Sequence, residues 1–171
     1  MHLLKCLNYF HLRKNLTIDR WQRRKDGLPK ITYPDMLPIT AKKDRIIRAV
    51  RTHPVVIVTG ETGSGKTTQI PKMCLAAERG IRGIIAHTQP RRIAAVAAAQ
   101  RIADELGEPL GRSVGYKIRF DERTGPNPYI QVMTDGILLA EAQTDPYLRR
   151  YDTIRLSWTR PMSAASTSIL S

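Results

Sequence analysis

The chain has 171 residues, of which 42% are hydrophobic and 25% are charged, so it is long enough to fold as one domain around its own core. This composition excludes an intrinsically disordered protein, and no apolar run approaches the length of a membrane-spanning helix. The formal net charge of +13 favours an anionic partner.

The excess of basic residues is greatest in the N-terminal part of the chain, which begins with a basic leader at residues 1–30. The first residues lack the small-residue cleavage site of a signal peptide, so we expect a cytoplasmic protein. Arg20, Arg23, Arg24 and Lys25 flank Trp21, and such side chains can bind a nucleic-acid backbone and stack on a base. A leader that is simply solvated is an equally good interpretation.

After the leader, helical and strand-like patterns alternate. The run at 55–58 is continuous and β-branched, which is typical of a strand buried on both faces of a parallel sheet. Further strands are expected at 84–86, 113–120 and 129–133, a loop at 121–128, and helices at 39–51, 67–78, 91–106 and 136–142. The alternation predicts a doubly wound, parallel α/β sheet built from crossover units.

The sequence GETGSGKT at 60–67 matches the P-loop pattern between an expected strand and an expected helix. The glycines allow backbone N–H groups to point at phosphate oxygens, while Lys66 would reach the β- and γ-phosphates and the Thr67 hydroxyl would bind Mg²⁺. An ordinary glycine-rich turn is the alternative, but the flanking elements favour nucleotide binding. The predicted ATP-binding residues here are Gly60, Glu61, Thr62, Gly63, Ser64, Gly65, Lys66, Thr67 and Thr68.

Four motifs follow one another along the chain: GETGSGKTTQIP at 60–71, TQPRR at 88–92, GYKIRF at 115–120 and TDG at 134–136. In this order they resemble the DEAH-box ATP-dependent RNA helicases of the bacterial HrpA type. The resemblance implies a P-loop NTPase with a RecA-like fold, in which residues 31–154 form an incomplete first ATP-binding domain. It also implies ATP and Mg²⁺ as cofactors, and ATP hydrolysis coupled to translocation on RNA and to its unwinding.

The resemblance assigns further residues to the expected sites. It makes Lys66 and Thr67 the catalytic residues of this domain and places Arg101 against the adenine, although a solvated helix residue is the alternative for Arg101. Contacts with the backbone of single-stranded RNA are implied for Thr88, Arg91, Arg92, Thr134, Asp135 and Gly136. Arg91 and Arg92 begin an expected helix, where positive charge opposes the helix dipole, so an anionic partner is favoured over a merely solvated pair.

The chain departs from the family pattern after Tyr151-Asp152-Thr153-Ile154, where Asp-Glu-Ala-His is expected and residues 155–171 stand instead. Those acids would hold Mg²⁺ and orient the attacking water. Codons permitted for 158–169, read one frame away, encode DEAHERSLNID. We therefore expect that a frameshift near residues 154–156 produced an aberrant tail at 155–171.

Two interpretations of the whole chain follow. In the first, it is the N-terminal part of an ATP-dependent RNA helicase that binds ATP and nucleic acid. In the second, which is favoured for the isolated 171 residues, it is a non-catalytic remnant that binds nucleotide or RNA weakly, since the DEAH motif and a second RecA-like domain are missing. The tail is expected to disturb the sheet, because Arg155, Ser157 and Thr159 replace apolar residues beside the P-loop strand. Another P-loop enzyme, such as a small-molecule kinase, has no second motif in its favour.

Overall fold

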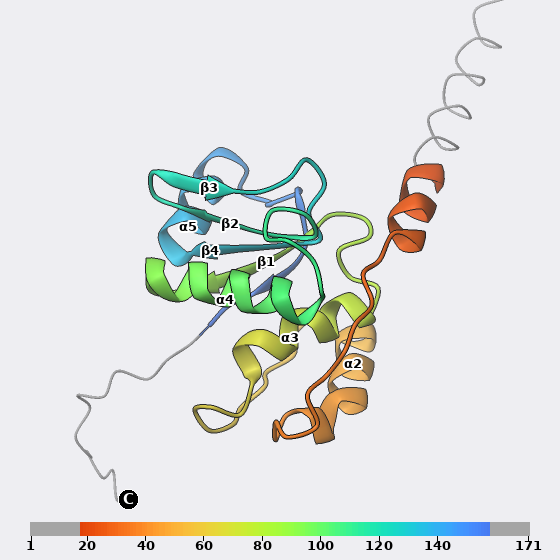
Figure 1. The fold of residues 1–171 in the computed structure, drawn as a ribbon. Coiled ribbons are helices and arrows are strands. Elements are labelled where there is room, and N and C mark those ends of the chain that lie inside the picture. The colour runs from red at the N-terminus through yellow and green to blue at the C-terminus, as the bar shows by residue number, and fades with distance from the viewer. Residues whose placement is uncertain (1–17, 158–171) are drawn as a thin grey trace, which may run out of the picture.

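The computed structural model describes residues 18–157, which form a single α/β unit (Figure 1). A helix at 18–26 precedes the labelled elements. These are η1 (Thr40–Lys42), α2 (Lys43–Thr52), α3 (Lys66–Ala76), β1 (Ile84–Gln89), α4 (Arg92–Glu105), β2 (Val114–Ile118), β3 (Asp121–Arg123), β4 (Ile130–Thr134), α5 (Asp135–Thr144) and β5 (Tyr151–Arg155). No helix among the described residues is both long and apolar enough to span a bilayer.

The five strands form one sheet in the order β3-β2-β4-β1-β5. β1 pairs in parallel with β4 and with β5, and β2 pairs in parallel with β4. Only β3 is antiparallel, to β2. β3 lies within the segment 121–128 that was expected to be a loop, and this short strand was not predicted.

Helices cover both faces of the sheet. On one face α2, α3 and α4 enclose the main core, which includes Ile85 of β1 and Ile130 and Val132 of β4 (Figure 1). On the other face a smaller cluster joins Ala86 and Met133 to Leu138 of α5. Because successive residues of a strand point to opposite faces, Ile85 and Ala86 serve different layers. The prediction of a doubly wound, mostly parallel α/β fold, consistent with a RecA-like domain, is confirmed.

The segment at 55–58 is not a strand, so that prediction was wrong. Val55 is 76% exposed and Ile57 is 85% exposed, and the sheet ends at β5. β5 has five residues, none of them fully buried, and its last residue is Arg155. An apolar run becomes a buried strand only when a neighbouring strand is available to pair with it and apolar layers cover both of its faces. Among the described residues, nothing supplies both for 55–58.

Arg24 attaches the helix at 18–26 to the rest of the domain. Its guanidinium donates hydrogen bonds to the carbonyl oxygens of Gly80 (2.7 Å), Pro128 (3.0 Å), Gly83 (3.3 Å) and Asn127 (3.3 Å). The Tyr129 hydroxyl in turn donates to the Arg24 carbonyl at 2.7 Å. These bonds join two loops of the domain to the leader, whose last part therefore packs against the domain.

Candidate nucleotide and RNA site

The P-loop at 60–67 has the backbone that its glycines suggest. Gly63 has φ +83° and Gly65 has φ +91°, in the left-handed region that costs side-chain-bearing residues energy. Gly65 is also the residue before α3, which begins at Lys66. A Cβ on Gly65 would lie 2.9 Å from Leu37 Cδ1, so the loop is packed tightly against the segment before η1. The glycine pattern thus sets both the loop conformation and the start of α3.

Lys66 points back into this loop. Its ammonium donates to the Gly60 carbonyl at 2.6 Å and to Ser64 Oγ at 3.0 Å, and it also donates to the Glu61 carbonyl. These weak neutral acceptors hold the cation at the mouth of the loop, where phosphate oxygens would be stronger partners. Thr67 follows in the first turn of α3 and is half-buried. A hydroxyl at this position, beside N–H groups of a helix start, fits Mg²⁺ bound together with nucleotide phosphates.

Two of the expected RNA-contact motifs meet at the carboxyl ends of neighbouring strands. In the β1–β4 register, Thr88 is opposite Met133 and Gln89 is opposite Thr134. Thr134 directly precedes α5, whose first residues are Asp135 and Gly136. Residues that are 46 positions apart in the chain therefore lie at one edge of the sheet, as parallel topology requires.

The side chains at this edge differ in their exposure. Arg91 precedes α4 and Arg92 opens it, and both are exposed. Gly136 is exposed, whereas Thr134 and Asp135 are half-buried. Thr88 is fully buried, and its Oγ1 accepts a hydrogen bond of 3.4 Å from the Ser157 backbone N–H. In this conformation the chain that follows β5 covers Thr88.

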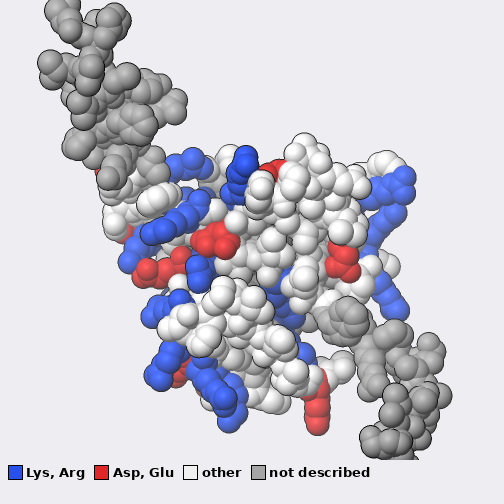
Figure 2. Space-filling model, turned by 180° about the vertical axis from the view of Figure 1, so that it is seen from behind, with Lys and Arg blue, Asp and Glu red and all other residues white. Residues whose placement is uncertain are grey.

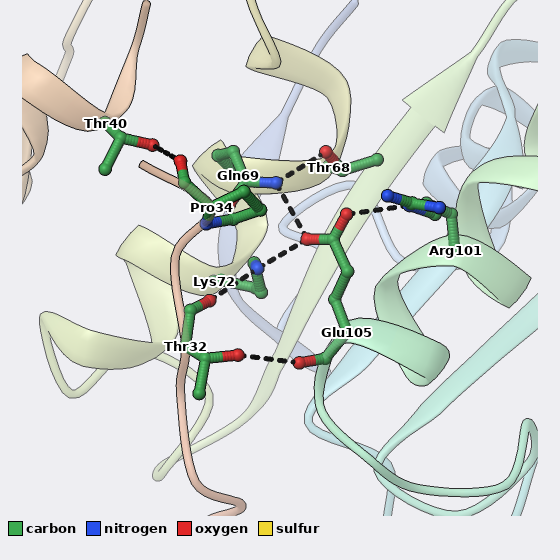
Figure 3. A network of polar contacts seen from close by, with 8 residues as sticks. All are labelled: Thr32, Pro34, Thr40, Thr68, Gln69, Lys72, Arg101 and Glu105. Carbon is green, nitrogen blue, oxygen red and sulfur yellow. Dashed lines mark hydrogen bonds and ion pairs between the residues drawn. The ribbon is translucent and has the colours of Figure 1, made fainter. Parts of the chain in front are cut away.

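Arg101 belongs to a network of polar contacts that joins three parts of the chain (Figure 3). Its Nε donates to Glu105 Oε1 at 2.8 Å, one turn along α4. Glu105 Oε2 accepts from Lys72 Nζ at 2.6 Å and from Gln69 Nε2 at 2.8 Å, both on α3. Lys72 also donates to the Thr32 carbonyl at 2.7 Å. We call Thr32, Gln69, Lys72, Arg101 and Glu105 the Glu105 network.

The Glu105 network was not predicted from the sequence. The i,i+4 spacing of Arg101 and Glu105 is typical of a helical ion pair, so the sequence could have indicated this one contact of the network. The burial of Lys72, which is fully inaccessible, depends on how α3 and α4 pack and has no local signal. Burial acts to raise the pKa of Glu105, but hydrogen bonds from Lys72, Gln69 and Arg101 outweigh it, so the pKa lies below its usual value.

Two of the four basic residues of the leader cluster, Arg24 and Lys25, make contacts within the protein, whereas Arg20 and Arg23 are exposed. Arg24 binds carbonyl groups, Lys25 pairs with Glu78 at 2.8 Å, and the Arg82 guanidinium lies 4.9 Å from the centre of the Trp21 ring. Figure 2 shows Lys and Arg at the margins of one face, around a largely uncharged centre. The net charge is therefore not gathered into a single patch on that face.

Arg155, the first residue of the expected aberrant tail, lies in β5 beside a buried histidine. Its Nη1 is 2.9 Å from Nδ1 of His87, which has no exposed surface. Burial lowers the pKa of Arg155 to about 10, and no carboxylate among residues 18–157 forms an ion pair with it. Ser157 lies just beyond β5, and Thr159 is outside the described residues, as are the frameshift residues 158–169.

Comparison with known proteins finds many relatives, and three RNA helicases among them illustrate the similarity. The chain is 56% identical over 131 residues to the ATP-dependent RNA helicase HrpA of Escherichia coli K12, which covers 77% of this chain and 10% of that protein. It is 47% identical over 152 residues to the HrpA homolog of Haemophilus influenzae, covering 88% and 12% of the two chains. It is 48% identical over 126 residues to the ATP-dependent RNA helicase DEAH13 of Arabidopsis thaliana, covering 70% and 10%.

These relatives extend far beyond the region of similarity. The chain spans about a tenth of the length of the relatives it matches. No protein-family model matches it.

Proposed function

The chain is homologous over most of its length to part of the DEAH-box RNA helicases of the HrpA type, and from this premise we propose that it is an ATP- and RNA-binding RecA-like domain. The observation that carries the proposal is the P-loop: two left-handed glycines, Gly63 and Gly65, lead into a helix that starts with Lys66 and Thr67. In an intact helicase this domain would take part in coupling ATP hydrolysis to movement on RNA. The proposed location is the cytoplasm.

In the proposed nucleotide site, the backbone of Gly60, Glu61, Thr62, Gly63, Ser64 and Gly65 surrounds the phosphates, with Thr68 behind it in α3. Lys66 exchanges its carbonyl partners for the β- and γ-phosphates. The Thr67 hydroxyl binds Mg²⁺, which neutralises phosphate charge when it is bound. Arg101, whose side chain is 66% exposed, stacks on the adenine through its planar guanidinium.

The proposed RNA site is the carboxyl edge of β1 and β4. Arg91 and Arg92 supply positive charge, and Thr134, Asp135 and Gly136 bring the start of α5 to the backbone of a single strand. Thr88 joins them only after the chain at Ser157 has moved, because that chain covers it. Such contacts involve phosphate and sugar and are expected to be indifferent to base identity.

We further propose that the 171 residues bind ATP without hydrolysing it. The sequence Asp-Glu-Ala-His, whose two acids would hold Mg²⁺ and orient the attacking water, does not occur in these 171 residues. This agrees with the interpretation of the chain as a non-catalytic remnant. Hydrolysis by the purified chain at a rate above background would contradict it.

Titration of the purified chain with Mg·ATP tests the nucleotide site. Lys66→Ala is expected to weaken binding at least tenfold, because it removes the cation that faces the β- and γ-phosphates. The matched control is Lys30→Ala, at an exposed lysine of the leader, which is expected to bind like the unaltered chain. Equal affinity of the Lys66→Ala and unaltered chains would refute the P-loop assignment.

Salt-dependent binding to a single-stranded RNA tests the second site. Replacing Arg91 and Arg92 by alanine should reduce the slope of log affinity against log salt by about 0.7 for each phosphate that the variant no longer neutralises. Alanine at the exposed Arg149 and Arg150 changes the net charge equally and serves as the control. If both pairs reduce the slope alike, the binding reflects net charge and not this edge of the sheet.

A further inference from the structure

We propose that Glu105 is a positioning residue for adenine recognition: it aims the Arg101 guanidinium at the nucleotide base and couples that arm to the P-loop helix α3. The inference rests on the proposed ATP site. It adds a role for a residue that makes no contact with the nucleotide itself.

The carboxylate of Glu105 divides its two oxygens between two helices. Oε2 faces α3 and accepts hydrogen bonds from Lys72 and Gln69, while Oε1 faces along α4 and accepts from Arg101 (Figure 3). Because α3 fixes Oε2, the direction of Oε1 is fixed as well. The contacts of Oε2 with α3 therefore hold the carboxylate in place, and Oε1 orients Arg101.

The α3 side of this arrangement is nearly dry. The Lys72 side chain is fully buried and that of Glu105 is 11% exposed, so their charges depend on each other. The Thr32 carbonyl also accepts from Lys72, and Thr32 Oγ1 donates to the Glu105 carbonyl at 3.1 Å. Both the side chain and the backbone of Glu105 are thus anchored before any ligand binds.

The Arg101 side of the carboxylate is open. The Arg101 side chain is 66% exposed, and Glu105 binds only its Nε. The two terminal nitrogens and the faces of the guanidinium plane stay available to a base. An arginine fixed at Nε loses less conformational freedom when a base stacks on it than a free side chain would.

The network also reaches the phosphate end of the site. Gln69 Nε2, which donates to Glu105, lies 2.8 Å from the hydroxyl of Thr68, the residue after Thr67. A displacement of α3 when phosphate binds at its first turn would be passed to Glu105 through Gln69 and Lys72. The geometry therefore links the two ends of the nucleotide through one carboxylate.

Glu105→Gln separates the two sides of the carboxylate. The amide has a single acceptor oxygen, and the buried charge of Lys72 demands it more strongly than the exposed Arg101 does. The amide NH₂ then faces Arg101 and cannot accept its hydrogen bond. The substitution therefore removes the hydrogen bond that orients the Arg101 guanidinium, with little change in side-chain volume.

The test compares binding of Mg·ATP with binding of Mg·tripolyphosphate, which has the phosphates without the base, to the full 171-residue chain. Glu105→Gln is expected to weaken ATP binding about tenfold, the size expected for one charge-assisted hydrogen bond, and to leave tripolyphosphate binding within about twofold. Arg101→Ala should produce the same base-selective loss. The double variant should lose no more than Arg101→Ala alone, because Glu105 acts on the base only through Arg101.

The matched control is Asp104→Asn. Asp104 lies one residue away on α4 and accepts the same kind of i,i+4 hydrogen bond, from Gln100 at 2.7 Å, as an exposed pair. It is expected to bind both ligands like the unaltered chain. If Glu105→Gln does not fold, as judged by circular dichroism, Glu105→Asp keeps a carboxylate to compensate the buried charge of Lys72 but is one methylene too short to bridge Lys72 and Arg101 at once.

The outcomes separate this inference from the proposed function. Equal weakening of ATP and tripolyphosphate binding by either Glu105 variant would mean a purely structural role, and unchanged binding of both would also overturn the inference. If Lys66→Ala leaves binding of both ligands unchanged, the proposed nucleotide site itself fails.

Discussion

Replacement of Arg155 by leucine is expected to stabilise the protein. Arg155 is the last residue of β5 and lies next to β1, where it is opposite His87. Its guanidinium is partly buried, and its only hydrogen-bond partner among the described side chains is the His87 ring. A cation in this position loses hydration without gaining a carboxylate.

The size of the effect can be worked out from the surroundings of the guanidinium. Burial lowers the pKa of Arg155 from its ordinary value to about 10, and at roughly 1.4 kcal/mol for each pKa unit this amounts to about 3 kcal/mol, which partial exposure reduces to about 2 kcal/mol. Half-burial of leucine contributes about 1 kcal/mol, and loss of the hydrogen bond to His87 costs about the same. The net expectation is a gain of about 2 kcal/mol.

Thermal unfolding at neutral pH measures the effect. For a chain of this length, a gain of that size should raise the Tm by about 4–8 °C. Arg150→Leu is the matched control, because Arg150 is exposed just before β5, and its Tm should change little. His87 keeps a polar neighbour in the variant, since Gln89 Nε2 lies 3.0 Å from its Nε2.

A Tm for Arg155→Leu that is equal to or below that of the unaltered chain would refute this reasoning. It would mean that the guanidinium is stabilised in β5 by more than its contact with His87. A rise shared with Arg150→Leu would instead point to the reduced net charge as the cause.

Three further predictions concern other residues. Burial, and then the charge of Arg155, lower the pKa of His87 well below its usual value, so below about pH 6.5 the unfolded chain binds a proton that the folded chain does not. The free energy of unfolding should therefore fall by about 1.4 kcal/mol for each pH unit of acidification. Urea titrations measure this slope, and His87→Gln should lack it. Gly65→Ala should lower the Tm more than Gly63→Ala, because both have positive φ but only the Cβ at 65 approaches another side chain, and equal losses would show that the contact with Leu37 is relieved. Sequencing of the gene through the codons for 158–169 should show DEAHERSLNID in another frame, and any other string there would reject the frameshift.

The sequence by itself determined those features whose causes are local. The glycines of the P-loop allow positive φ at 63 and 65, and helix-forming patterns place α3 and α4 within a few residues of where they lie. The alternation of elements was enough for the doubly wound fold, because crossover connections and strand order follow general rules. The motif order carried the resemblance that the comparisons bear out.

Only the tertiary structure decided which partners those elements meet. The apolar run at 55–58 has a strand's composition, yet it is exposed because strand formation needs a paired edge, and β5 ends at Arg155. A lysine is expected to be exposed, yet Lys72 is buried, because the fold brings Glu105 and Thr32 to it from other segments. Hydrogen bonding and burial of this kind depend on atoms distant along the chain, whereas glycine conformations and helix starts depend on neighbours within a few residues.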